Sequence, residues 1–319
     1  MGAVSRTEPV RATVVTPSLN QGAWIGDALE SVRSQTYPFV EHLVVDGGST
    51  DKTLAVLKAA SAGSSLAWNS APDRGMYEAI NKGIRQARGT IVCYLNADDL
   101  LAPWAVEAAV EVFLAHPEVD VVYGDAVELA DGRPSSLKLQ VPFQWERIVR
   151  YGSLVQPAVF WRRDVATRVG SFDSDLQFVG DLDYWLRIGK SGRFHHLDEV
   201  LAAYRVHSAA KTSRFRTDMR QEELQMRIAH DSRRRGRMLH QLRARISHGW
   251  AVRVQLLRFV ASIGSGADAR WGRFRVDGDP AGDRLQWALA LLPLAGRLGN
   301  SAVVRVRRGW LARFESTKR

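Results

Sequence analysis

The sequence has few of the features on which several common protein classes depend. It contains a single cysteine, Cys93, among 319 residues, so this chain can form neither an internal disulfide framework nor a cysteine-rich zinc site. Its longest apolar run, 287–295, is interrupted by Pro293 and falls far short of the ~20 residues of a membrane-spanning helix. The first ten residues show no apolar segment, and we expect no secretory signal. A composition of 45% hydrophobic and 24% charged residues instead indicates a globular protein with a full core.

The charge is distributed unevenly along the chain. Residues 1–210 carry a net charge of −5, whereas residues 211–319 carry +15. This asymmetry favours an anionic partner for the basic region, and a solvated arginine-rich surface is the alternative. Val303, Val306, Trp310 and Phe314 recur at helical spacing and predict an amphipathic helix. Such a helix either lies on an anionic membrane surface or packs against the rest of the chain. We expect the membrane contact, in a cytoplasmic protein that is peripheral on the inner face of the cell membrane.

Short apolar strands and amphipathic helical segments alternate in the first half of the chain. We expect strands at 11–16, 42–45, 66–68, 91–95 and 119–123, and helices near 25–32, 54–57 and 76–87. This alternation predicts an α/β fold with a mostly parallel sheet and helices on both faces.

Polar segments directly follow three of the expected strands. They are Thr16-Pro17-Ser18, Asp46-Gly47-Gly48-Ser49 and Asn96-Ala97-Asp98-Asp99. In parallel sheets, ligands bind at the carboxyl ends of the strands. We therefore expect these segments to form one binding site.

Five segments resemble, in order, family 2 glycosyltransferases. They are TPSLN at 16–20, VVDGGSTD at 44–51, DRGMYEAINKG at 73–83, LNADD at 95–99 and GDLDYW at 180–185. The resemblance implies a GT-A fold, a Rossmann-like and mostly parallel sheet flanked by helices. We place this catalytic domain at 1–213 and a basic helical C-terminal extension at 214–319.

The resemblance also implies an activity. It indicates an inverting, metal-dependent hexosyltransferase of the kind that builds bacterial surface glycans. The donor is a nucleotide sugar, with a UDP-linked sugar favoured over dTDP- and GDP-linked ones. The acceptor is a hydroxyl of a glycan or of a polyprenyl-linked glycan.

The resemblance places the donor against residues from four segments. These residues are Thr16, Pro17, Ser18, Asp46, Asp73, Arg74, Asn81, Lys82, Asn96 and Ala97. The Asp46 carboxylate suits a base imide or a ribose hydroxyl, although an Asx-turn role would explain it too. The Arg74 guanidinium suits a phosphate, and Lys82 either faces the donor or is solvated.

Asp98 closes a DxD-like element and is the expected ligand of Mg²⁺ or Mn²⁺, which prefer carboxylate oxygens. Asn96 stands where the family often has Asp, so it is better suited to a ribose contact than to metal ligation. His207 either completes the metal site or has a structural role.

Asp181 is the expected general base that accepts the proton of the acceptor hydroxyl. Asp183, two residues on, is the competing candidate, and a helix-capping role is compatible with either function. Gly180 replaces the first residue of the acidic pair that the family usually has at this point.

Two other classes remain as alternatives. A nucleic-acid-binding protein could act through the basic region, but that region lacks a Cys/His site and an aromatic stacking motif. A dinucleotide oxidoreductase would need Gly-x-Gly-x-x-Gly after the first strand. Residues 16–22, which follow that strand in this chain, do not have this pattern. We therefore favour the glycosyltransferase and do not expect a nucleic-acid partner.

Overall fold

The computed structural model describes residues 9–130, 132–150 and 152–231. The helix expected around residues 303–314, and most of the proposed extension at 214–319, lie outside the described residues. Among those that are described, no helix is both long enough and apolar enough to cross a membrane.

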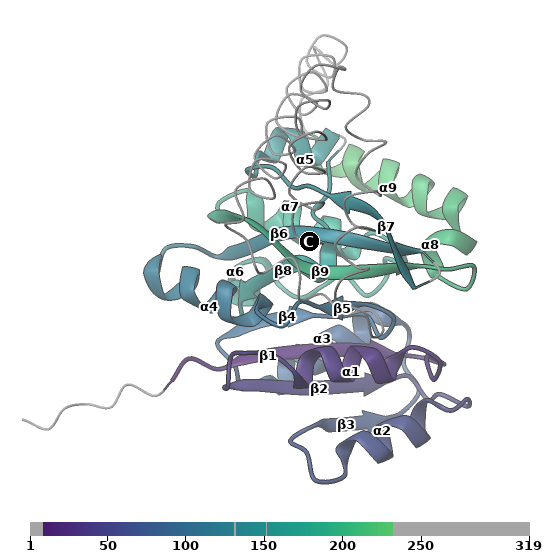
Figure 1. Ribbon diagram of the computed structural model, residues 1–319. Coiled ribbons are helices and arrows are strands. Elements are labelled where there is room, and N and C mark those ends of the chain that lie inside the picture. Colours follow the sequence, from purple (N-terminus) through teal and green to yellow (C-terminus); the bar gives the residue numbers. More distant parts are fainter. Residues whose placement is uncertain (1–8, 131, 151, 232–319) are drawn as a thin grey trace, which may run out of the picture.

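The first half of the chain folds as the alternation predicts, with strands and helices following each other in turn (Figure 1). Its elements are β1 (Ala12–Ser18), α1 (Ile25–Arg33), β2 (Val40–Asp46), α2 (Thr53–Ser61), β3 (Ala67–Ser70), α3 (Met76–Gln86), β4 (Ile91–Tyr94), β5 (Leu100–Leu101) and α4 (Ala105–Ala115). In Figure 1, α1 lies in front of the sheet and α3 behind it. Because helices cover both faces, β1 is buried along its whole length, as strands of parallel sheets usually are.

The second half is less regular and contains the longest strands. Its elements are β6 (Val121–Ala130), β7 (Arg133–Lys138), α5 (Trp145–Arg150), the 3₁₀ turn η1 (Gln156–Ala158), β8 (Val159–Arg162), α6 (Val165–Val169), α7 (Gly180–Gly189), β9 (Phe194–Val206), α8 (Lys211–Arg214) and α9 (Arg216–His230).

One sheet runs through both halves, in the order β3-β2-β1-β4-β8-β6-β9-β5, with β7 paired to β6. The strands β3, β2, β1 and β4 are parallel, as expected. The sheet becomes mixed beyond them, because β8 runs antiparallel to both β4 and β6. β9 pairs in parallel with β6, and the short β5 runs antiparallel to β9.

Pro17 lies inside β1 rather than in the turn expected after it. β4 pairs with β1 only as far as Val15, whose carbonyl accepts from Leu95 N–H. Successive residues of a strand point their N–H groups to opposite sides. The missing N–H of Pro17 therefore faces the side on which β4 has already ended, where no ladder hydrogen bond is lost.

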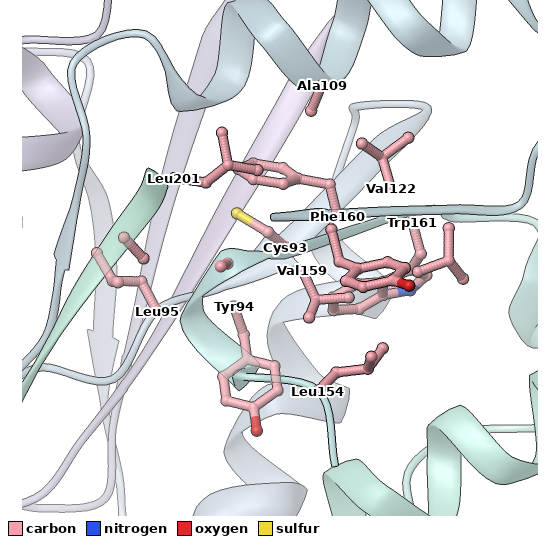
Figure 2. Packing of buried hydrophobic residues seen from close by; sticks show 14 of the residues in the cluster. Cys93, Tyr94, Leu95, Ala109, Val122, Leu154, Val159, Phe160, Trp161 and Leu201 are labelled. Carbon is pink, nitrogen blue, oxygen red and sulfur yellow. The ribbon is translucent and has the colours of Figure 1, made fainter. Parts of the chain in front are cut away.

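The core beneath the second half is built from large side chains of neighbouring strands (Figure 2). Phe160 and Trp161 of β8 pack beside Cys93 and Tyr94 of β4, with Leu201 of β9 close by. All of them are almost fully buried, and burial raises the pKa of the Cys93 thiol. Cys93 therefore stays protonated and acts as a small hydrophobic residue.

Gly83 sets how closely α3 approaches β1. A Cβ at this position would lie 2.3 Å from Cγ1 of Val15. We expect Gly83→Ala to lower the free energy of unfolding by about 1–3 kcal/mol, because the helix must move off the strand. Urea unfolding followed by circular dichroism measures the change.

Gly26→Ala in α1 is the matched control, since its Cβ would meet nothing closer than 3.8 Å. Alanine favours the helix there, so this variant should be neutral or more stable by up to about 1 kcal/mol. Equal stability of the two variants would contradict the close packing of α3 on β1.

Candidate active site

A cavity of about 630 Å³ opens at the carboxyl ends of the parallel strands. The register aligns these ends, since Ser18 pairs with Asp46 and Asp46 with Ser70. In Figure 1 the chain enters β1 from the left, so this edge faces right, the side on which α8 lies. The expected site residues that line the cavity are Pro17, Ser18, Asp73, Asn96, Ala97, Asp98 and Asp181.

Asp98 lines the cavity and pairs with His207, which lies next to it but is not itself a lining residue; we call this part of the cavity the Asp98 end. Oδ2 of Asp98 lies 3.1 Å from Nε2 of His207, although the two residues follow different strands, β4 and β9. Arg205 supports the pair by donating to the backbone carbonyl of Asp98 at 3.1 Å. The Trp24 ring lies 5.0 Å from the His207 ring and 5.2 Å from the Arg205 guanidinium carbon.

Asp99 lies behind this pair and is only 4% exposed. It accepts hydrogen bonds from Arg205 N–H at 3.0 Å and from Asn96 Nδ2 at 3.1 Å. Burial, together with the neighbouring charge of Asp98, raises the pKa of Asp99 well above its usual range. Asp99 is thus a buried support of the site, and Asp98 presents the carboxylate to the cavity.

Two oxygens of the cavity residues have no hydrogen-bond partner among the described residues. They are Oγ of Ser18 and Oδ1 of Asn96, and both are buried. A buried polar atom without a partner costs free energy, so each is suited to a group that a ligand supplies.

The donor atoms at this end fit a divalent cation that shares its coordination with a ligand. In the part of the chain that the structure describes, no three His, Cys, Asp or Glu side chains are grouped closely enough to hold a metal alone. Mg²⁺ is commonly held by one or two carboxylates together with substrate phosphates. Asp98 and His207 match that arrangement, in which most of the coordination comes from a bound phosphate and water.

Asp181 lies in the first turn of α7 and lines the same cavity. Burial raises the pKa of Asp181 to about 6, and the charge of Glu223 adds to this effect. Leu182 N–H, at 2.8 Å, and the Tyr77 hydroxyl act in the opposite direction by hydrogen bonding to the carboxylate. A carboxylate with this pKa is ionised near neutral pH and can still accept a proton.

The structure distinguishes Asp181 from Asp183. Asp183 does not line the cavity, and its carboxylate accepts from Arg187 Nε and pairs with His230 Nε2, both at 2.8 Å. Although burial acts in the opposite direction, these contacts lower the pKa of Asp183. Asp183 thus connects α7 to α9, whereas Asp181 is available to a ligand.

Gly180 has no room for a side chain. A Cβ there would lie 2.7 Å from the ring of Tyr77, which is buried and stacks in parallel on Phe172. This contact accounts for the glycine in place of the first acidic residue. Tyr77 is a site residue to which the sequence pattern assigned no function, although it lies one helical turn before Asn81.

Three of the expected donor residues lie behind the cavity wall. Thr16 is buried, with Oγ1 2.9 Å from Nε2 of His42. Asn81 donates to the carbonyl of Phe172 at 2.8 Å and accepts from its N–H at 3.0 Å. Asp46 is fully buried and already accepts hydrogen bonds from the loop that follows it.

Arg74 and Lys82 lie beside the cavity, on either side of Glu78. Nε of Arg74 is 2.9 Å from one oxygen of Glu78, and Nζ of Lys82 is 3.1 Å from the other. The Arg74 side chain is 72% exposed, so it can leave this ion pair at little cost.

Sequence comparison agrees with this geometry. The family model "Glycosyl transferase family 2" matches residues 13–157. A PGL/p-HBAD biosynthesis glycosyltransferase of Mycobacterium bovis is 31% identical over 178 residues, which are 55% of this chain and 68% of the relative. The chain belongs to glycosyltransferase family 2. This assignment favours a transferase enzyme over the nucleic-acid-binding alternative.

Solved structures show that this family 2 glycosyltransferase has the GT-A fold. S. aureus TarS 1-349, in complex with UDP-GlcNAc, is 20% identical, with a TM-score of 0.56 over 69% of this chain and 66% of TarS 1-349. The chain thus spans slightly less than two thirds of TarS 1-349. The mannosyltransferase PcManGT from Pyrobaculum calidifontis, in complex with GDP-Man and Mn²⁺, is also 20% identical. Its TM-score is 0.55, over 96% of this chain and 87% of PcManGT.

Proposed function

We propose that this chain is an inverting glycosyltransferase that moves a hexosyl group from a nucleotide sugar to an acceptor hydroxyl. The observation that carries the proposal is the shared cavity, which is lined both by Asp98, the partner of His207, and by Asp181. The relatives support the donor class, because TarS is in complex with UDP-GlcNAc and PcManGT with GDP-Man and Mn²⁺. A UDP-linked sugar is the donor that we test first.

The Asp98 end is the proposed site of the donor diphosphate. Asp98 and His207 would hold Mg²⁺ or Mn²⁺, which supplies positive charge to the departing nucleoside diphosphate. Oγ of Ser18 and Oδ1 of Asn96 would meet donor hydroxyls, because neither has another partner among the described residues. Pro17, Ala97 and Asp73 form the wall around them. Arg74 follows Asp73 in the chain and is exposed, so we propose that it turns toward a phosphate.

Asp181 is the proposed general base. Its carboxylate accepts the proton of the acceptor hydroxyl while that oxygen forms a bond to the anomeric carbon. The bond between this carbon and the diphosphate oxygen breaks in the same displacement, so the configuration inverts. The proposed acceptor is a glycan or a polyprenyl-linked glycan at the inner face of the cell membrane.

The first prediction concerns the Asp98 end. Asp98→Ala should abolish transfer without unfolding the chain, because it deletes the proposed metal ligand at the cavity surface. The measurement is release of nucleoside diphosphate from UDP-, GDP- and dTDP-sugars in Mn²⁺. The control is Asp164→Ala, an exposed carboxylate away from the cavity. Wild-type turnover by Asp98→Ala would make the metal assignment wrong.

The second prediction concerns the base. Asp181→Asn should reduce transfer by ~10²–10⁴, because the amide cannot accept the proton. Donor affinity should change little. Asp183→Asn is the matched control and should affect stability more than the rate, since its partners are Arg187 and His230. If Asp181→Asn transferred normally and Asp183→Asn were inactive, Asp183 and not Asp181 would be the base.

The pH dependence of transfer tests the same base. With a pKa of about 6, Asp181 is protonated below that pH, so kcat/KM should fall as the pH decreases through 6. Tyr77→Phe removes a hydroxyl that lowers the pKa of Asp181 and keeps the ring that packs on Gly180. The acid limb should move to higher pH in this variant. An unchanged acid limb of the kcat/KM profile would show that a group other than Asp181 controls it.

We also propose that the basic region, net +15 over residues 211–319, attaches the enzyme to an anionic membrane. Each basic residue near such a surface contributes about 1 kcal/mol. The full chain should therefore sediment with anionic vesicles at low salt, less as salt rises, and weakly with neutral vesicles. Failure to sediment with anionic vesicles at low salt would indicate instead that the region packs on the protein.

A further inference from the structure

The same cavity has a second part whose chemistry differs from that of the Asp98 end. This part is formed by residues of the segment before α7, of α8 and of the start of α9. We refer to it as the amphipathic end, and its residues are Gln177, Phe178, Lys211, Arg214, Phe215 and Met219.

Two cations of the amphipathic end, Lys211 and Arg214, form no ion pair with an acidic side chain in the part of the chain that the structure describes. Among the described residues, no carboxylate lies within 4.0 Å of the charged groups of Lys211 or Arg214. Nζ of Lys211 donates to the carbonyl of Gln177, and partial burial lowers the pKa of Lys211.

Glu222 is the acidic residue whose charge acts on Lys211. Its two oxygens accept from the backbone N–H groups of Gln177, Phe178 and Val179, at 2.7–3.0 Å. These bonds hold the carboxylate against the backbone, so Glu222 acts on Lys211 through its charge and forms no ion pair with it within 4.0 Å.

Apolar groups lie directly beside the two cations. The ring of Phe178 lies 5.0 Å from Nζ of Lys211, and the ring of Phe215 lies 5.5 Å from the Arg214 guanidinium carbon. The two rings are 5.8 Å apart, and Phe215 is 39% exposed. A large aromatic side chain this exposed, next to unpaired cations, is suited to a ligand that is apolar and anionic at once.

We infer that the amphipathic end binds the acceptor as an organic phosphate, with the phosphate against Lys211 and Arg214 and the hydrocarbon against Phe178 and Phe215. The inference rests on the proposed function, in which Asp181 accepts the proton of the acceptor hydroxyl. The donor diphosphate is proposed to occupy the Asp98 end, so a second phosphate needs cations of its own. Lys211 and Arg214, which line the same cavity, supply them.

Octyl phosphate is a suitable probe, because binding can be measured by calorimetry on the full chain without any transfer. It should bind at least about tenfold more tightly than inorganic phosphate or octyl glucoside, since each of these lacks one half of the ligand. Phenyl phosphate is a further arm. Tighter binding of octyl phosphate indicates a lipid-derived acceptor, and tighter binding of phenyl phosphate indicates an aromatic one.

Lys211→Gln and Arg214→Gln should each weaken octyl phosphate binding about tenfold, as loss of a charge-assisted contact implies. Phe215→Ala should also weaken it. Arg216→Gln is the matched control, because Arg216 is exposed and does not line the cavity. Circular dichroism checks that each variant is folded.

Three results would overturn the inference. They are equal binding of octyl phosphate and octyl glucoside, unchanged affinity in both Lys211→Gln and Arg214→Gln, and displacement of octyl phosphate by UDP with Mn²⁺. Asp98→Ala should bind octyl phosphate normally. The experiment therefore distinguishes a wrong inference about phosphate binding at the amphipathic end from a wrong proposal about the transfer reaction.

Discussion

The buried carboxylate of Asp46 is the interaction on which the donor edge of the cavity depends. It accepts from both the N–H and the hydroxyl of Ser49, from Gly48 N–H, and from the hydroxyl of Ser70 on the neighbouring strand. Ser49 in turn accepts from Asn20 N–H, which lies in the loop after β1. A fully buried charge is stable only when it is well hydrogen-bonded, and here those bonds join three strand ends. The loops that face the nucleotide are thus held in place before any ligand binds.

The charges along the cavity follow from this scaffold. The Asp98 end presents a carboxylate and a histidine, an arrangement that favours a cation and repels a bare diphosphate. The amphipathic end presents two cations and needs no metal to hold an anion. Asp181 lines the same cavity, and its burial raises its pKa to about 6. A donor bound with its cation and an anionic acceptor would therefore each meet charge of the opposite sign.

The sequence predicted the parallel half of the fold because local patterns determine it. The strands β1, β2 and β4 are short and largely buried, and a polar segment follows each where the ligand edge lies. The mixed half could not be predicted in the same way, since β8 inserts between β4 and β6, and β9 pairs with β6 about 70 residues away. Such pairings depend on contacts that no local period records. The sequence pattern did not predict the amphipathic end either, because its residues come from segments that are distant along the chain.

The contacts of Asp181 and Asp183 could not be predicted from the sequence pattern, and they support Asp181 as the proposed base. Residues two apart on a helix point about 200° from each other, so only one of the two can face the cavity. The pattern alone does not say which, whereas the contacts of Asp183 with Arg187 and His230 settle its direction. His207 is similar, because its approach to Asp98 depends on how β9 is placed beside β6 and β5.

The replacement of an acidic residue by Gly180 changes how the neighbouring base is controlled. A second carboxylate beside Asp181 would raise its pKa by like-charge repulsion, and one of the pair would then hold a proton near neutral pH. Tyr77 occupies that space instead, and its hydroxyl lowers the pKa of Asp181 by hydrogen bonding. Because the Tyr77 ring is fixed by its stacking on Phe172, which Asn81 holds through two backbone hydrogen bonds, the hydroxyl has little freedom to move. The glycine, the tyrosine and the asparagine therefore act together, and they favour a single ionised carboxylate at the position of the proposed base.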